Sequence, residues 1–150
     1  MDERVAKLDT PEACERFAGN AIRLGRRDLA DEARRRAVEL RAEMKGGSSQ
    51  AERECLQAVY AYEEILSKKN GRRTSASRTW QMIKRHGILV AAERAVNRET
   101  ETVGYKALAE MGLQEYAFEA VILRHPELFS KEAVRCSRER MKEWSESSTE

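Results

Sequence analysis

Residues able to carry out catalysis are few in this chain, and none of them forms a known motif. The two histidines, His86 and His125, belong to no His-Glu-x-x-His zinc pattern, and the chain has neither a phosphate-binding glycine loop nor a Gly-x-Ser-x-Gly nucleophile elbow. His125 precedes Pro126 at the end of an apolar segment, where we expect it to cap helix carbonyl groups rather than to act as a base. The sequence therefore predicts a protein with no catalytic residue, no cofactor and no metal site.

Three acidic residues supply the one catalytic alternative. Glu63, Glu110 and Glu119 fall on the apolar faces of predicted helices, and carboxylates that met there could hold a divalent metal for nuclease chemistry. Because Glu and Arg are abundant along the whole chain, ion pairing across a helical bundle is the simpler expectation for these acids. The nuclease hypothesis depends on the three carboxylates lying close together.

A basic segment in the middle of the chain stands apart from the rest. Between Glu64 and Glu93 there is no Asp or Glu, although the chain contains 26 of them. Seven Lys and Arg residues lie in this gap, while the formal net charge is +2, so the remainder of the chain carries −5. They are Lys68, Lys69, Arg72, Arg73, Arg78, Lys84 and Arg85. A local excess of this size attracts polyanions.

The residue types of the basic segment favour nucleic acid as that polyanion. Arg72 and Arg73 belong to a loop with hydroxyl residues, and backbone amides at the start of a following helix also donate hydrogen bonds to phosphate oxygens. We expect the seven basic residues to contact the phosphate backbone, with Thr74 and Ser77 as neutral donors. DNA is the expected ligand ahead of RNA. A membrane surface would instead require a basic amphipathic helix with large exposed apolar residues.

The same charges admit a different interpretation. Arg72, Arg73 or Arg78 could pair with acids of the N-terminal segment and fix it against the rest of the protein. The chain would then be a protein–protein adaptor or a small homo-oligomer with no role in nucleic-acid binding. Exposed parts of Trp80 or Trp144 would contribute to that protein interface.

The composition predicts helices as the elements that position these residues. The chain is 41% hydrophobic and 36% charged, with 8 Gly and 2 Pro in 150 residues, and it is rich in Ala, Glu, Arg and Leu. We expect an all-α protein with seven or eight helices, in which an N-terminal antiparallel helical hairpin precedes an irregular bundle of five or six short helices. The hairpin would span residues 1–46, the bundle 47–144 and a disordered polar tail 145–150. The Gly-Gly-Ser-Ser break between hairpin and bundle allows the hairpin either to dock on the bundle or to project from it.

Capping signals and helix breakers set the expected boundaries. Thr10-Pro11 starts the first helix and Gly25 ends it, and the second runs from Asp28 to about Lys45, with Met44 on its apolar face. Ser49 and Glu52 form a capping box for a third helix that ends at Asn70-Gly71. Ser75 or Ser77 would cap the fourth, which ends near His86. The later helices are expected over residues 88–97, 105–111 after a cap near Thr102, 113–124 and 130–144.

Two features of side-chain placement complete the expectations. Trp80, Met82 and Ile83 do not share one narrow stripe, so at least one of them should be exposed. The cysteines are odd in number and widely separated, which favours buried apolar residues over disulfides or zinc ligands. They are Cys14, Cys55 and Cys136.

The N-terminus has no apolar stretch like that of a secretion signal, so we expect a cytoplasmic protein of bacterial type.

Overall fold

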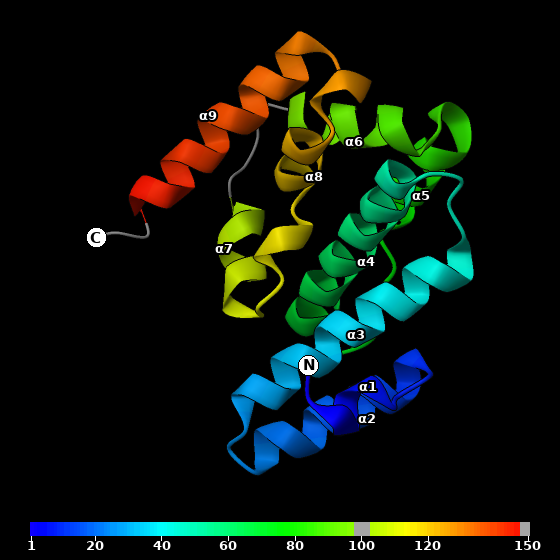
Figure 1. Ribbon diagram of the computed structural model, residues 1–150, viewed down its shortest axis with the longest axis vertical. Coiled ribbons are helices and arrows are strands. Elements are labelled where there is room, and N and C mark those ends of the chain that lie inside the picture. The colour runs from blue at the N-terminus through cyan, green and yellow to red at the C-terminus, as the bar shows by residue number, and fades with distance from the viewer. Residues whose placement is uncertain (98–102, 148–150) are drawn as a thin grey trace.

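The chain folds into helices throughout the part that the structure describes. The computed structural model describes the backbone of residues 1–97 and 103–147 and the side chains of residues 1–97 and 106–145. Within these ranges nine α-helices and two short 3-10 turns are the regular elements, and no strand occurs (Figure 1). The all-α prediction is confirmed. The expected cap at Thr102 and the last three residues of the tail lie outside the described residues.

The N-terminal segment forms the predicted hairpin. A short helix α1 (Glu3–Ala6), which the sequence did not indicate, precedes α2 (Pro11–Arg23) and α3 (Arg27–Lys45). The Thr10 hydroxyl accepts a hydrogen bond from the amide of Ala13 at 3.1 Å, as its capping role requires. Gly25 makes the turn with φ +72°, a conformation that L side chains rarely adopt. Small residues let the two helices pack closely; these are Ala18, Ala21, Ala30 and Ala33.

The hairpin docks on the remainder of the protein rather than projecting from it. Helix α4 (Gln50–Asn70) lies against α3 (Figure 1). Val38 of α3 is fully buried and shares a core cluster with Ala61 of α4 and Leu113. Because this cluster includes both parts, residues 1–46 and 47–144 contribute to one hydrophobic core.

The long helix α4 begins and ends where the sequence predicts. The Ser49 hydroxyl accepts from the Glu52 amide at 3.2 Å, and the Glu52 carboxylate accepts from the Ser48 amide at 3.2 Å. At the other end, Gly71 adopts the left-handed conformation with φ +70° and closes the helix. One face of α4 carries Cys55, Leu56 and Val59 into the centre of the core.

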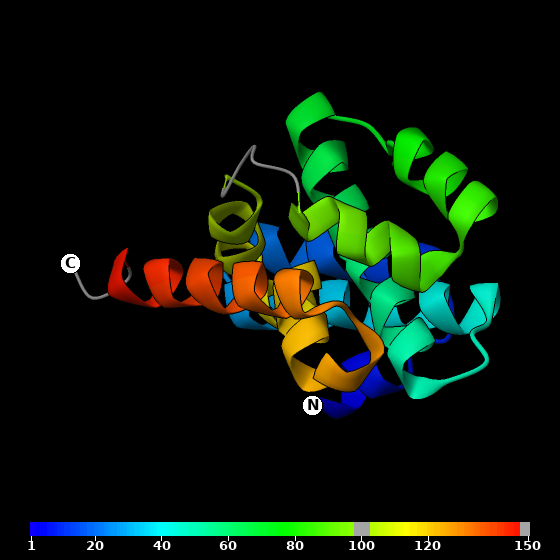
Figure 2. The same ribbon diagram turned by 90° about the horizontal axis from the view of Figure 1, so that it is seen from above.

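The remaining helices are α5 (Ser77–His86), α6 (Ile88–Asn97), α7 (Val103–Glu110), α8 (Phe118–Arg124) and α9 (Lys131–Ser147), with 3-10 turns at Gln114–Tyr116 and Pro126–Leu128. Of these, α6, α7 and α8 pack on α4, while α5 packs on α6 and α9 packs on α6 and α8. In Figure 2 the end of α4, the following loop and α5 lie at the top and upper right of the molecule, while α9 extends to the left. The Ser130 hydroxyl caps α9 through the Ala133 amide at 3.1 Å.

Several local expectations are wrong. The segment 113–124 is broken at Ala117, whose extended backbone separates the first 3-10 turn from α8. That turn carries Tyr116 into the core, where its hydroxyl donates to Glu39 of α3 at 3.1 Å. Helix α9 continues to Ser147, three residues beyond the predicted end of the bundle. Met44 is 78% exposed, whereas Ala42 in the same last turn of α3 is buried in the core.

The cysteines and the helix lengths bear on two further expectations. Cys14 and Cys55 are fully buried, as predicted, whereas Cys136 is half-buried, and all three are free thiols. Burial raises the pKa of the Cys55 thiol to about 12. Among the described residues, none of the helices combines the length and the apolar character that crossing a bilayer would require.

Candidate functional site

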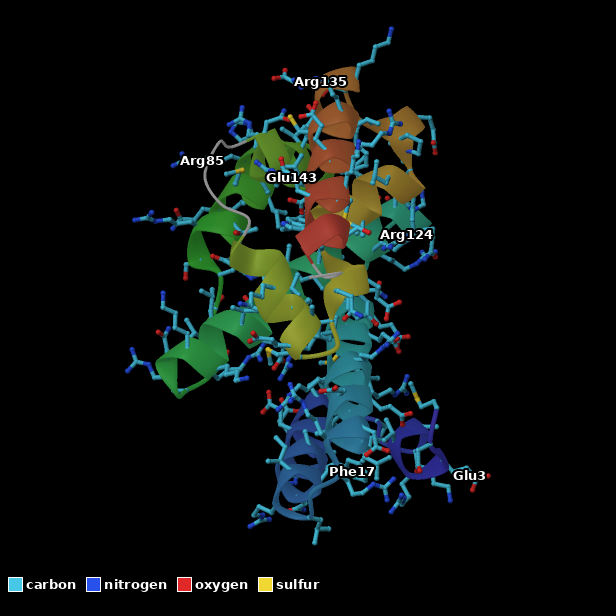
Figure 3. All side chains as sticks on the ribbon, turned by 90° about the vertical axis from the view of Figure 1, so that its left-hand side faces the viewer. Glu3, Phe17, Arg85, Arg124, Arg135 and Glu143 are labelled. Atoms are coloured by element: carbon cyan, nitrogen blue, oxygen red, sulfur yellow. The ribbon has the colours of Figure 1, made fainter. Side chains whose placement is uncertain are left out.

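Six of the seven basic residues of the central segment are exposed and form no ion pair in the described part of the chain, and we call these six residues the basic face. Lys68 and Lys69 end α4, Arg72 lies in the loop, and Arg78, Lys84 and Arg85 lie on α5. In Figure 3 Arg85 lies at the outer edge of the molecule, on the opposite side from Arg124. The basic face is therefore available to a ligand from solvent.

Helix α5 divides cleanly into an outer and an inner side. Its exposed side chains are polar or basic and include Arg78, Gln81, Lys84 and Arg85. Thr79, Trp80, Met82 and Ile83 are half-buried, and of these Trp80 and Ile83 pack against the core. The expectation that at least one of Trp80, Met82 and Ile83 would be exposed is wrong, because all three are half-buried, with Trp80 and Ile83 packed against the core cluster of α4 and α6.

A buried carboxylate holds α5 in place. Glu63 of α4 is only 4% exposed, and its Oε2 accepts from the Ser75 hydroxyl at 3.1 Å, the Ala76 amide at 2.8 Å and the Trp80 Nε1 at 2.7 Å. Ala76 is the N-cap of α5, and neither Ser75 nor Ser77 caps it with a side chain. The capping prediction is therefore wrong: Glu63, from a different helix, satisfies the amide at the helix start and carries a negative charge beside it.

Arg73 is engaged by acids and does not belong to the basic face. Its guanidinium lies 2.8 Å from Glu64, 3.2 Å from Glu63 and 3.6 Å from Glu15 of α2. Arg41 of α3 contacts the same Glu64 at 2.9 Å and also Glu15. This cluster joins the hairpin, α4 and the loop. The alternative interpretation of the basic segment named Arg72, Arg73 or Arg78 for such a contact, and of these three only Arg73 forms an ion pair among the described residues.

The two neutral donors differ in their surroundings. Thr74 is half-buried; its amide donates to the Ser67 hydroxyl at 2.9 Å and its own hydroxyl donates to the Arg72 carbonyl at 2.9 Å. These bonds shape the loop. Ser77 is exposed in the first turn of α5, beside Arg78. Of the predicted pair, Ser77 is the one placed next to the basic face.

The acids considered as metal ligands are occupied or separate. Besides Glu63, Glu119 pairs with Arg140 at 3.1 Å, and Glu110 is exposed at the end of α7. Among the residues that the structure describes, no three His, Cys, Asp or Glu side chains form a group able to hold a metal ion. The arrangement matches the ion pairing expected for Glu63 and Glu119 and gives the nuclease hypothesis no site.

His125 forms part of a second buried carboxylate cluster. Its Nε2 lies 2.8 Å from Glu54 Oε2, and Arg124 Nε lies 2.5 Å from Glu54 Oε1. The imidazole therefore contacts a carboxylate of α4 instead of capping helix carbonyl groups. Burial raises the pKa of the Glu54 carboxyl, but hydrogen bonds from His125, Arg124 and Gln50 outweigh it, so the pKa lies below its ordinary value of 4.5.

A further cation and two aromatic rings adjoin the basic face. Lys45, the last residue of α3, places its Nζ over the Trp80 ring at 5.0 Å from the centroid. The Tyr60 ring lies 5.2 Å from that of Trp80, tilted by 54°. The sequence carried no signal for this group, since α3, α4 and α5 each contribute one member and only their packing brings these together.

The geometry of this surface is the only guide to its role. Comparison of the chain with protein-family models, with curated proteins and with solved structures found no match.

Proposed function

We propose that this chain is a non-catalytic protein that binds nucleic acid through its basic face and contacts mainly the phosphate backbone. The observation that carries the proposal is the set of six exposed cations without an ion pair among the described residues, gathered on the end of α4, the loop and α5. Phosphate contacts of Lys and Arg supply most of non-specific nucleic-acid affinity. The surface contains no arrangement of side chains that favours one base sequence, so binding independent of sequence is expected.

The nearby acids support the availability of these charges. Glu15, Glu63 and Glu64 are the acids closest to the loop in the ion-pair network, and Arg41 and Arg73 contact them. Two of their three negative charges are thus compensated by residues outside the basic face. The net-acidic remainder of the chain would repel a polyanion elsewhere and orient it toward this side.

Salt dependence provides a direct test. If all six cations meet phosphates of a duplex, the slope of log K against log salt concentration should be about −5, from roughly −0.9 per neutralised phosphate. The triple variant Arg78→Ala, Lys84→Ala, Arg85→Ala should reduce this slope by about three phosphate equivalents and weaken binding of a labelled DNA oligonucleotide at low salt. Arg73 is left intact because its loss would disturb the hairpin contact.

A matched control removes the same charge from another surface. Lys131, Arg138 and Lys142 are exposed on α9, and no ion pair of theirs occurs in the described structure. Their replacement by alanine should leave the slope nearly unchanged, as measured by fluorescence anisotropy. Equal losses in the two triple variants would show that only the net charge matters and would refute a defined interface.

The hairpin gives a specific reason to keep the adaptor role as a second candidate. Ile22 and Leu24, at the tip between α2 and α3, are 50% and 78% exposed. Apolar residues at such a tip suit a contact with another protein or a second copy. Two results together would favour the adaptor role over nucleic-acid binding. Protein partners would remain bound to the chain after nuclease treatment of a lysate, and the triple variant of Arg78, Lys84 and Arg85 would bind DNA as the wild type does.

A further inference from the structure

Trp80 lies at the inner margin of the basic face with its ring held in one orientation. Its Nε1 donates to the buried Glu63 carboxylate at 2.7 Å, which fixes the rotation of the indole. Tyr60 of α4 packs against it with ring centroids 5.2 Å apart. Because Trp80 is half-buried, part of its indole remains accessible beside the exposed residues of α5.

The cover over the Trp80 ring is a movable cation. Lys45 is exposed, and its Nζ lies over the ring at 5.0 Å from the centroid. The ammonium is attracted by the negative face of the ring, an interaction of modest strength at an exposed position. A lysine side chain is flexible, so a ligand with its own π-face could take the place of the ammonium. Lys84 follows Trp80 by one helical turn and adds a second cation nearby.

We propose that the basic face takes single-stranded nucleic acid, with one base stacked on Trp80 and Lys45 moved from the ring to an adjacent phosphate. This inference rests on the proposed function and names the class of its ligand. Every base offers a π-face, and stacking on an aromatic side chain between cations is a sequence-tolerant mode of single-strand binding. In a duplex both faces of each base are covered by its neighbours, so a duplex can meet only the cations.

Three ligands with the same number of phosphates separate stacking from charge. They are an oligothymidylate, a strand of abasic deoxyribose phosphates and a short DNA duplex, each labelled for fluorescence anisotropy at one salt concentration. The oligothymidylate should bind about tenfold more tightly than the abasic strand, which is the size expected for one stacked base. Trp80→Leu should bring the affinity for oligothymidylate down to that for the abasic strand while leaving the latter unchanged.

A second measurement does not depend on how well Trp80→Leu folds. The chain has two tryptophans, so Trp144→Phe leaves Trp80 as the only indole emitter. Its fluorescence should be quenched by oligothymidylate and not by the abasic strand. Equal affinity for these two strands, with unchanged Trp80 emission, would overturn the stacking inference and leave backbone binding standing. Failure of all three ligands to bind would overturn the proposed function itself, and the stacking inference with it.

Discussion

The buried Glu63 carboxylate should be among the most important polar groups for stability, and its removal tests the account given of α5. In Glu63→Ala four donors lose their acceptor. Arg73 is 38% exposed at its side chain and Ser75 is exposed, so both can turn to water. The Ala76 amide and the Trp80 Nε1 have poorer access to solvent, since Ala76 is 4% exposed and Trp80 is half-buried.

The magnitude follows from those last two donors. A buried hydrogen-bonding group left without a partner costs about 1–3 kcal/mol, so the loss should be about 2–6 kcal/mol. That is a large share of the roughly 5–15 kcal/mol by which a domain of this kind is stable. The free energy of unfolding can be measured by urea denaturation followed by far-ultraviolet circular dichroism. Glu63→Gln keeps one acceptor oxygen and should lose less than Glu63→Ala.

An exposed glutamate provides the comparison. Glu43 lies exposed near the end of α3, and Glu43→Ala should change the free energy of unfolding by no more than about 0.5 kcal/mol. If Glu63→Ala is as mild as Glu43→Ala, the four hydrogen bonds do not hold the loop and α5 as described. Trp80 should become less buried in Glu63→Ala, and its fluorescence should shift as a result.

Two further predictions concern titration and reactivity. The lowered pKa of Glu54 means that its contribution to stability is present above the ordinary value of 4.5 and is lost as the pH falls through the folded-state pKa. The difference in unfolding free energy between the wild type and Glu54→Gln should therefore shrink below about pH 4.5. A difference that stays constant at acidic pH would contradict the assignment. Burial of Cys55, which raises its pKa to about 12, should protect this thiol from thiol reagents in the folded protein, and Cys14 is equally inaccessible. Peptide mass spectrometry after brief alkylation should therefore find Cys136 modified first. Early modification of Cys55 would show that this part of the core opens.

Helix boundaries in this chain were readable from local chemistry. Thr10-Pro11, Ser49 with Glu52, and Gly71 act through hydrogen bonds and backbone preferences within a few residues, so the sequence predicted α2 and the start and end of α4 correctly. The run of 28 residues without an acid between Glu64 and Glu93 is likewise a property of the sequence. It located the surface that remains the best candidate for function.

Tertiary packing decided which of those charges are available and what surrounds them. Arg73 and Arg78 look alike in the sequence, yet Arg73 meets three carboxylates from α2 and α4 while Arg78 faces solvent. The start of α5 likewise depends on Glu63, a residue from another helix, which no pattern of nearby capping residues can indicate. Local propensity acts over a turn or two of helix. Ion pairs and the Trp80–Lys45 contact instead depend on which helices lie side by side, and only the packed core determines that.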